Sequence, residues 1–308
     1  MLTDIKIKFS NFIKKHKSKI ILLFIVWLII IFINNYIGNL EEQPEIKTSY
    51  KPHESVMETG TEVPEKLQDP FEEILNKYME YCNQKNYEEA YKLIDETCKE
   101  EFFPDIETFK QYVDTKFDTK KAYSIQNYSN VGNIYVYRIR RFDDILATGM
   151  TGQEDFTYQE ELVSVYNDDG NLSLGIGSFI GKETLNETYE DNDIKITVEK
   201  RIITYDTEVY YVKVSNRGDN VAVISNYKTS GEIVLDIGDE TRDNKSRILP
   251  IIVNPGGEMS IGLTFTKFFD EPQGDKKLIF NSIRIFENYT GAETDEQAIR
   301  AFAVEIDV

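Results

Sequence analysis

The sequence predicts an α+β protein with an N-terminal transmembrane helix, three helices packed on a curved antiparallel sheet, and then an all-β sandwich. Three observations predict this order. An unbroken apolar run covers residues 20–33, apolar residues recur with a helical period between residues 69 and 117, and short extended runs separated by turn residues follow from residue 121 onward. A period near 3.6 is typical of amphipathic helices, and strict alternation is typical of half-buried strands.

The apolar run predicts a membrane-spanning helix. It holds fourteen apolar residues, and its continuation to Ile37 gives eighteen, within the roughly 17 to 25 residues that cross a bilayer. Six lysines precede the run and two glutamates follow it, an asymmetry that places the N-terminus in the cytoplasm. We therefore expect a basic cytoplasmic tail over residues 1–19, an anchor over residues 20–38, and the bulk of the chain outside the cell membrane.

A cleaved secretory signal is the alternative that the length of this run leaves open. Signal peptidase requires small residues of the A-x-A kind after the apolar core, and the first alanine of this chain is Ala90. The sequence therefore favours an uncleaved single-pass anchor.

The segment that follows the anchor, residues 39–68, predicts a disordered stalk. It carries Pro44, Pro52 and Pro64, is rich in charge, and has scattered apolar residues without a period. Residues 41–308 as a whole hold 29 basic and 53 acidic side chains, a net charge of −24. A surface this acidic repels phosphate backbones. We therefore expect no nucleic-acid partner.

Three helices are expected next, because capping residues stand before three stretches of helical period. The first begins at Asp69-Pro70, an acidic cap followed by proline. The second begins after Asn86, and its apolar stripe ends at Cys98. The third begins around Pro104-Asp105. Cys82 and Cys98 each complete an apolar stripe on consecutive helices of a hairpin, at distances that argue against a disulfide, so both are interpreted as buried thiols.

Alternating strands complete the first folded domain, which we place at residues 69–183. Extended runs are expected around residues 123–125, 135–139, 156–166 and 172–179, with residues 167–171 as a hairpin turn. A second domain, residues 191–308, shows no helical period. About eight extended runs are expected there, at residues 194–203, 208–214, 221–227, 232–237, 247–253, 258–266, 278–286 and 298–308. Regularly spaced strands of this kind predict a β-sandwich.

Residues 78–117, which read YMEYCNQKNYEEAYKLIDETCKEEFFPDIETFKQYVDTKF, resemble the helical opening of the nuclear transport factor 2-like superfamily in membrane-anchored bacterial proteins. The resemblance implies a cone-shaped fold whose concave sheet meets the helices around a pocket. Residues 209–220 and 254–265 resemble immunoglobulin-like accessory domains of bacterial surface proteins. Neither resemblance implies a reaction, because both folds carry many functions.

Few groups with catalytic chemistry are available. The only histidines, His16 and His53, lie in the basic tail and the stalk, so neither folded domain can build a Ser-His-Asp triad, a Cys-His pair or a His-ligated zinc site. We therefore expect no catalytic residue, no metal and no cofactor. Loops at residues 167–171, 191–193 and 236–244 supply oxygen ligands but lack the spacing of a calcium loop.

Two groups of side chains are candidates for binding. The tyrosines that could line a pocket of the cone are Tyr91, Tyr112, Tyr135 and Tyr137, although ordinary packing explains them as well. Arg138, Arg140 and Arg141 could meet an acidic partner, but we interpret them as the solvent side of a strand, balanced by nearby aspartates.

Three functions are compatible with these features. The favoured one is a non-catalytic cell-envelope protein that binds or positions another surface component, with a protein partner at the cell surface and a small-molecule ligand left open. The second is a structural subunit of a conjugation or secretion channel. The third is an Asp/Tyr-dependent enzyme acting on a small hydrophobic substrate in the cone.

Overall fold

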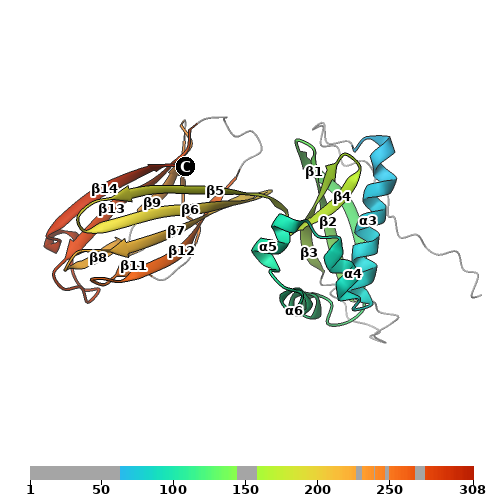
Figure 1. Cartoon of the computed structure of the whole chain (residues 1–308), viewed down its shortest axis with the longest axis horizontal. Coiled ribbons are helices and arrows are strands. Elements are labelled where there is room, and N and C mark those ends of the chain that lie inside the picture. The colour runs from blue at the N-terminus through green and yellow to red at the C-terminus, as the bar shows by residue number, and fades with distance from the viewer. Residues whose placement is uncertain (1–62, 144–157, 227–230, 239, 247–249, 268–274) are drawn as a thin grey trace, which may run out of the picture. The chain divides into compact units, whose positions relative to one another are not determined.

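The computed structural model describes residues 63–143, 158–226, 231–238, 240–246, 250–267 and 275–308 (Figure 1). These residues form four α-helices, one short 3-10 helix and fourteen strands. The predicted fold class is therefore wrong, because strands dominate the described chain and the helices number four rather than three. The predicted anchor, residues 39–62 of the predicted stalk and both histidines lie outside the described residues. None of the described helices is long and apolar enough to span a membrane.

Helix α3 (Glu65–Asn83) begins one turn before the predicted start at Asp69. Pro64 is its N-cap residue, and Pro70 lies inside the helix rather than at its first position. The additional turn is held by Val63, which is 6% exposed and whose carbonyl oxygen accepts a 3.0 Å hydrogen bond from the Gln68 side chain. The sequence pattern did not indicate this contact.

The predicted second helix is broken into α4 (Tyr87–Lys92) and α5 (Glu96–Phe102). The break occurs because Ile94 forms a bridge with Leu174 of the first sheet, where Asp95 N donates to the Leu174 carbonyl oxygen over 2.9 Å. Asp95 then caps α5 by accepting hydrogen bonds from two backbone amides. Helix α6 (Ile106–Lys116) has Asp105 as its N-cap, as predicted.

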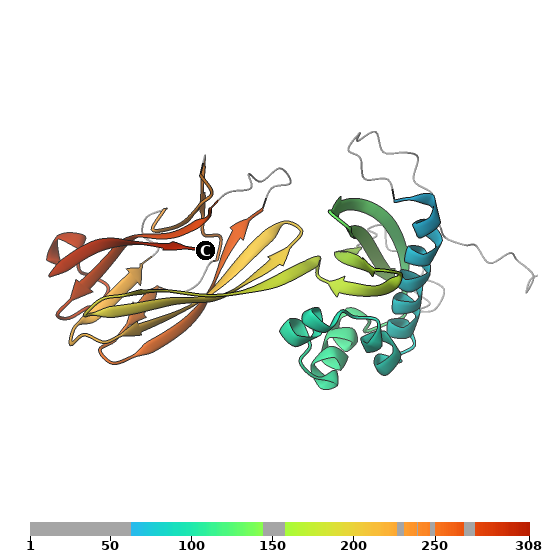
Figure 2. The same cartoon turned by 45° about the horizontal axis from the view of Figure 1, so that its top comes forward.

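The first sheet contains β1 (Lys121–Val131), β2 (Ile134–Asp143), β3 (Gln159–Asp168) and β4 (Asn171–Ile176), antiparallel and in sequence order. The four helices pack with this sheet in a shared apolar cluster, here called the helical core, and α3 runs alongside the sheet in Figures 1 and 2. Its large buried side chains include Phe71, Leu75, Tyr78, Met79, Phe109 and Phe117. Residues 167–171 form the predicted β3–β4 turn, in which Asp169 and Gly170 have positive φ.

Two further sheets build the rest of the described chain. The second sheet has the order β12-β7-β6-β5, and the third has the order β10-β9-β13-β8-β11, with β14 paired to β13. The strands are β5 (Phe179–Glu190), β6 (Ile194–Thr204), β7 (Thr207–Asn216), β8 (Val221–Ser225), β9 (Ile233–Asp236), β10 (Thr241–Asp243), β11 (Ile251–Val253), β12 (Glu258–Thr266), β13 (Lys277–Phe286) and β14 (Arg300–Asp307).

The inward faces of the second and third sheets share a separate apolar cluster, the strand core, whose large members include Tyr210, Leu235, Phe265 and Phe280. Each predicted run between residues 194 and 308 contains a described strand. The prediction missed β10, which has only three residues and pairs with β9 alone. A strand so short has no measurable period.

The β5–β6 hairpin contributes to both cores. Phe179 and Ile202 belong to the helical core, whereas Ile194, Ile196 and Val198 of the same hairpin belong to the strand core. Cys82 and Cys98 are free and buried, which confirms their interpretation as thiols inside the helical core.

Candidate binding site

The predicted pocket tyrosines lie around the helical core in two groups. In the first group, Tyr91 packs on Phe109 with ring centroids 5.5 Å apart, and Tyr112 packs on Phe103 at 5.1 Å. The Tyr91 hydroxyl donates a 2.8 Å hydrogen bond to the Phe103 carbonyl oxygen. Two tyrosines thus share one aromatic cluster formed by α4, α6 and the loop after α5.

The second group lies on β2. Tyr135 and Tyr137 both contact Phe71 of α3, with ring centroids 5.1 and 6.4 Å apart. Phe71 is fully buried and Tyr137 is 4% exposed. The structure therefore brings the four tyrosines together in pairs, the first around Phe103 and Phe109 and the second around Phe71.

Glu161 on β3 joins Tyr112 to Arg141 on β2. The Tyr112 hydroxyl donates to Glu161 Oε1 over 2.6 Å, and Arg141 Nη1 lies 2.8 Å from Glu161 Oε2. Burial raises the pKa of Tyr112, and the neighbouring Glu161 carboxylate raises it further. Tyr112 is therefore a neutral donor at ordinary pH, and both carboxylate oxygens of Glu161 already have a partner.

The interpretation of all three arginines as solvent-facing is wrong for Arg141, which is 2% exposed. Alternation along β2 places Arg141 on the same face as Tyr137 and Ile139, toward the helical core. Arg138 and Arg140 lie on the opposite face, and both pair with Glu160.

The loop at residues 191–193, which was considered for calcium, has a protein partner. Asp191 Oδ2 accepts from Arg300 over 2.7 Å, and Asp193 Oδ2 accepts from the same guanidinium over 2.5 Å. Residues 167–171 form the hairpin turn described above. In the part of the chain that the structure describes, no group of three His, Cys, Asp or Glu side chains could hold a metal ion.

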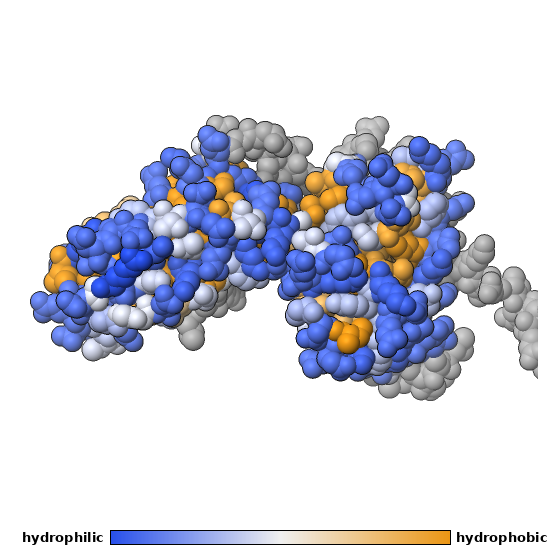
Figure 3. All heavy atoms as spheres, viewed as in Figure 1, coloured by the Kyte–Doolittle hydropathy of each residue, from blue (hydrophilic) through white to orange (hydrophobic). Residues whose placement is uncertain are grey.

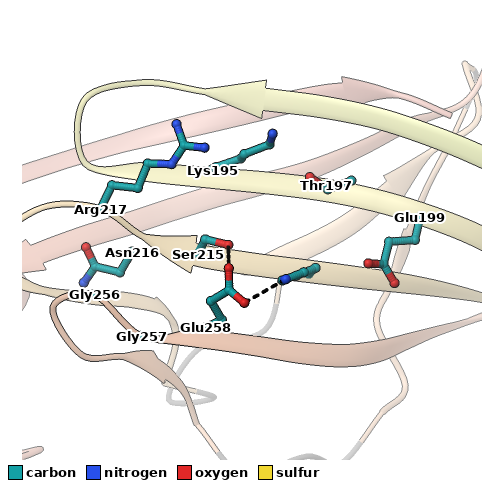
Figure 4. Close-up of a pocket in the computed structure, with 10 residues that line it drawn as sticks. Lys195, Thr197, Glu199, Ser215, Asn216, Arg217, Gly256, Gly257 and Glu258 are labelled. Atoms are coloured by element: carbon teal, nitrogen blue, oxygen red, sulfur yellow. Dashed lines mark hydrogen bonds and ion pairs between the residues drawn. The ribbon is translucent and has the colours of Figure 1, made fainter.

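A hollow of about 570 Å³ lies on the outward face of the second sheet, over β6, β7 and β12 (Figure 4). We call it the binding hollow. Its lining is entirely polar side chains and glycine: Lys195, Thr197, Glu199, Lys213, Ser215, Asn216, Arg217, Gly256, Gly257 and Glu258. In Figure 3, the part of the molecule that holds the second sheet is covered mostly by hydrophilic residues.

Strand alternation builds the floor of the binding hollow. On β7, buried and outward residues alternate from Thr207 to Asn216, so Lys213 and Ser215 point away from the strand core. On β6 the pairing register shifts between Val198 and Lys200, which leaves Glu199 as the extra residue of a bulge. Bulges re-aim side chains and are common beside functional sites.

Two turns form one wall of the hollow. Asn216 fixes the first turn, because its side-chain amide donates to the carbonyl oxygens of Asn220 and Val253 over 2.7 and 2.8 Å. Gly218 packs closely in that turn, since a Cβ there would lie 2.9 Å from Asp193 Oδ1 and would require that carboxylate to shift. The second turn contains Gly256, whose φ of +69° favours glycine.

The lysines and the arginine of the hollow are paired with carboxylates. Lys213 Nζ lies 2.7 Å from Glu258 Oε2, and Ser215 Oγ donates to Glu258 Oε1 over 2.9 Å. The bond from Lys213 lowers the pKa of Glu258, and the bond from Ser215 lowers it further. Glu190 on β5 pairs with both Arg217 and Lys195. The hollow and its rim therefore present three cations beside the three carboxylates Glu190, Glu199 and Glu258.

A second hollow of about 470 Å³ lies where β5, β13 and β14 meet, and is lined by Leu185, Glu187, Asp275, Lys276, Lys277, Asp307 and Val308. Sequence reasoning named no residue of either hollow as a site. The two turns that wall the first one were recognised as turn signals at residues 216–218 and 254–257. The direction in which these side chains point depends on which distant strands pair with each other. The local sequence carries no signal for that pairing.

The fold and the hollow together define a β-rich protein with a polar, charge-balanced surface site. Comparison with family models and with curated proteins finds no match. Among solved structures, the chain is similar to the yjhA protein from Bacillus subtilis, with 17% identity over 41% of this chain and 99% of that one, and a TM-score of 0.28. It is also similar to the ycdA protein from Bacillus subtilis, with 10% identity over 41% of this chain and 39% of that one, and a TM-score of 0.26. At these scores neither similarity carries a functional argument.

Proposed function

We propose that this chain is a non-catalytic cell-envelope protein that binds another surface component of polar, uncharged chemistry in the binding hollow. The observation that supports this most is the charge pairing within the hollow. Its cations are neutralised by Glu190 and Glu258, while residues 41–308 carry a net charge of −24. An anionic ligand would meet an unfavourable overall field without a free cation to offset it.

The polar cluster in the helical core supports a non-catalytic function. Of the four predicted pocket tyrosines, Tyr112 has a hydrogen-bonded carboxylate, Glu161, which is the kind of pair that the enzyme alternative needs. Tyr112 and Arg141 occupy both oxygens of Glu161, and burial keeps the Tyr112 phenol neutral. A general base must lie within hydrogen-bond reach of the proton that it abstracts, and neither hollow described above is lined by Glu161 or Tyr112. An enzyme of this kind is therefore not proposed.

The location at the cell surface is part of the proposal and rests on the sequence. The apolar run of residues 20–33, with lysines on one side only, favours a single-pass anchor with the folded part outside. Membership of the nuclear transport factor 2-like or immunoglobulin-like groups also stays a prediction. No described feature specifically favours a channel subunit.

The experiment measures co-sedimentation of the full-length chain, in detergent micelles, with washed envelope material from the cells that produce it. The test variant carries Lys213→Ala and Glu258→Ala, which remove an ion pair of the hollow without changing the net charge. Wild-type chain is expected to sediment with the envelope, and the variant is expected to stay in solution.

A matched control carries Lys277→Ala and Glu305→Ala, a cross-strand pair on the third sheet. Its lysine and glutamate side chains are 42% and 59% exposed, close to the 38% and 56% of Lys213 and Glu258. The control is expected to bind like the wild type. Equal binding by both variants would overturn the proposal. Loss confined to the control would also overturn it, because Lys277 lines the second hollow.

A further inference from the structure

Tyr211 lies on β7 next to the binding hollow, beyond the residues that line it. It belongs to the outward-facing row of β7, two residues before Lys213, and is 37% exposed. At a rise of about 3.4 Å per residue, the row Tyr211, Lys213 and Ser215 is about 14 Å long. An aromatic ring thus continues a row of hydrogen-bonding groups along one strand.

A lysine ammonium lies on one side of the Tyr211 ring. The Lys200 ammonium lies 4.7 Å from its centroid, and Lys200 is itself bonded to Glu101 of α5. Opposite Tyr211 on β12 is Gly262, where an added Cβ would have only Val209 within 4 Å. Lys200 therefore restricts the Tyr211 ring before binding, and the residue directly opposite on β12 has no side chain.

Such a site combines two kinds of contact that one ligand class uses together. A sugar ring has an apolar face of C–H groups, which packs on an aromatic ring, and a rim of hydroxyls that each donate and accept. Lys213, Ser215 and Glu258 present donors and acceptors side by side on adjacent strands. A ligand that carries charge of only one sign would be attracted either to the lysine or to the glutamate, and repelled by the other.

From this geometry, and on the basis of the proposed function, we infer that the binding hollow takes a neutral oligosaccharide chain. The chain lies along β7, with one sugar stacked on Tyr211 and the next sugars bonded to Lys213, Ser215 and Glu258. The arrangement favours an extended, uncharged glycan over an acidic polymer or a basic peptide.

Isothermal titration of the full-length chain in detergent micelles tests this inference. The neutral probes are short oligosaccharides of glucose, N-acetylglucosamine, galactose and mannose, with an oligogalacturonate as the anionic probe and an oligolysine as the cationic probe. At least one neutral probe is expected to bind. Tyr211→Ala is expected to weaken that binding about tenfold, equivalent to about 1.4 kcal/mol, whereas Tyr211→Phe retains it.

Tyr158→Ala is the matched control, because Tyr158 is a 55% exposed tyrosine next to the first sheet. It should bind the neutral probe like the wild type. Absence of binding by all neutral probes, or equal weakening by Tyr158→Ala and Tyr211→Ala, would overturn the inference. A charged probe that binds only when Lys213 and Glu258 are present would also overturn it, together with the uncharged chemistry proposed for the ligand, while leaving the hollow as the place of binding. If the Lys213→Ala and Glu258→Ala variant sediments with the envelope as the wild type does, the proposed function itself is contradicted.

Discussion

Arg284 of β13 donates a 2.6 Å hydrogen bond from Nη2 to Glu232 Oε1 at a site where the two side chains are 2% and 5% exposed. Glu232 Oε2 also accepts a 2.6 Å bond from Ser225 Oγ of β8. A buried charge of this kind is tolerated only while its partner is present. The pair therefore ties two strands of the third sheet to the segment before β9.

Glu232→Ala should destabilise the fold by about 3 kcal/mol, because it leaves the Arg284 guanidinium buried with Asp295 as its remaining carboxylate. Chemical unfolding of the full chain in detergent micelles, followed by circular dichroism, measures this. Glu305→Ala removes an exposed partner of Lys277 and should change the free energy of unfolding far less. Equal losses in the two variants would contradict the buried role of Glu232.

Glu101→Gln should lower the free energy of unfolding by about 2 kcal/mol at neutral pH, since Glu101 binds both Lys182 and Lys200. Burial disfavours the Glu101 carboxylate, but the hydrogen bonds from the two lysines outweigh it and lower its pKa below the ordinary 4.5. Its contribution is thus present above pH 4.5 and is lost as pH falls through the lower folded pKa. Unfolding curves of the two proteins should therefore converge in acid, and a constant difference would contradict this.

Both thiols should resist alkylation in the folded chain. Burial raises the pKa of Cys82 and of Cys98 to about 12, so neither forms the reactive thiolate near pH 8. Iodoacetamide followed by mass spectrometry should label them only after denaturation. Because an unfolded thiol ionises near pH 9 and the folded one does not, stability should fall as pH rises from about 9 to about 12. The Cys82→Ala and Cys98→Ala double variant should show a shallower fall.

The buried state of both native thiols allows the orientation in the membrane to be tested with introduced cysteines. On intact cells, a membrane-impermeant maleimide should label Thr48→Cys, which lies after the predicted anchor. It should spare Ser10→Cys, which precedes it, until the membrane is opened. Labelling of Ser10→Cys on intact cells, or recovery of a chain trimmed near residue 40, would contradict the single-pass arrangement.

Local signals predicted most of the elements, and contacts between distant segments caused the errors. Asp105 marks α6 correctly because a side-chain cap is a local device. Ile94 continues a helical stripe in sequence, yet its pairing with Leu174 breaks that helix. Arg141 looks exposed beside Arg140, and only its place on the inward face of β2 and its bond to Glu161 account for its burial.

The candidate site was less predictable than the fold. Lys195, Lys213 and Glu258 stand on three different strands, and two antiparallel pairings bring them to one face. A pattern of period two predicts that each side chain alternates, but it does not say which strands are neighbours. The tyrosines were conspicuous by composition, and the structure places them in packing roles around the helical core.

The β5–β6 hairpin, which supplies Phe179 and Ile202 to one core and Ile196 and Val198 to the other, has a mechanical consequence. A force applied to a ligand bound over β6 and β7 is carried by the backbone hydrogen bonds of the β5–β6 hairpin. Through Phe179 and Ile202 it reaches the helical core, which follows the predicted anchor in the sequence. Melting of either half uncovers apolar side chains of this hairpin, so a variant that destabilises one half should also lower the stability of the other.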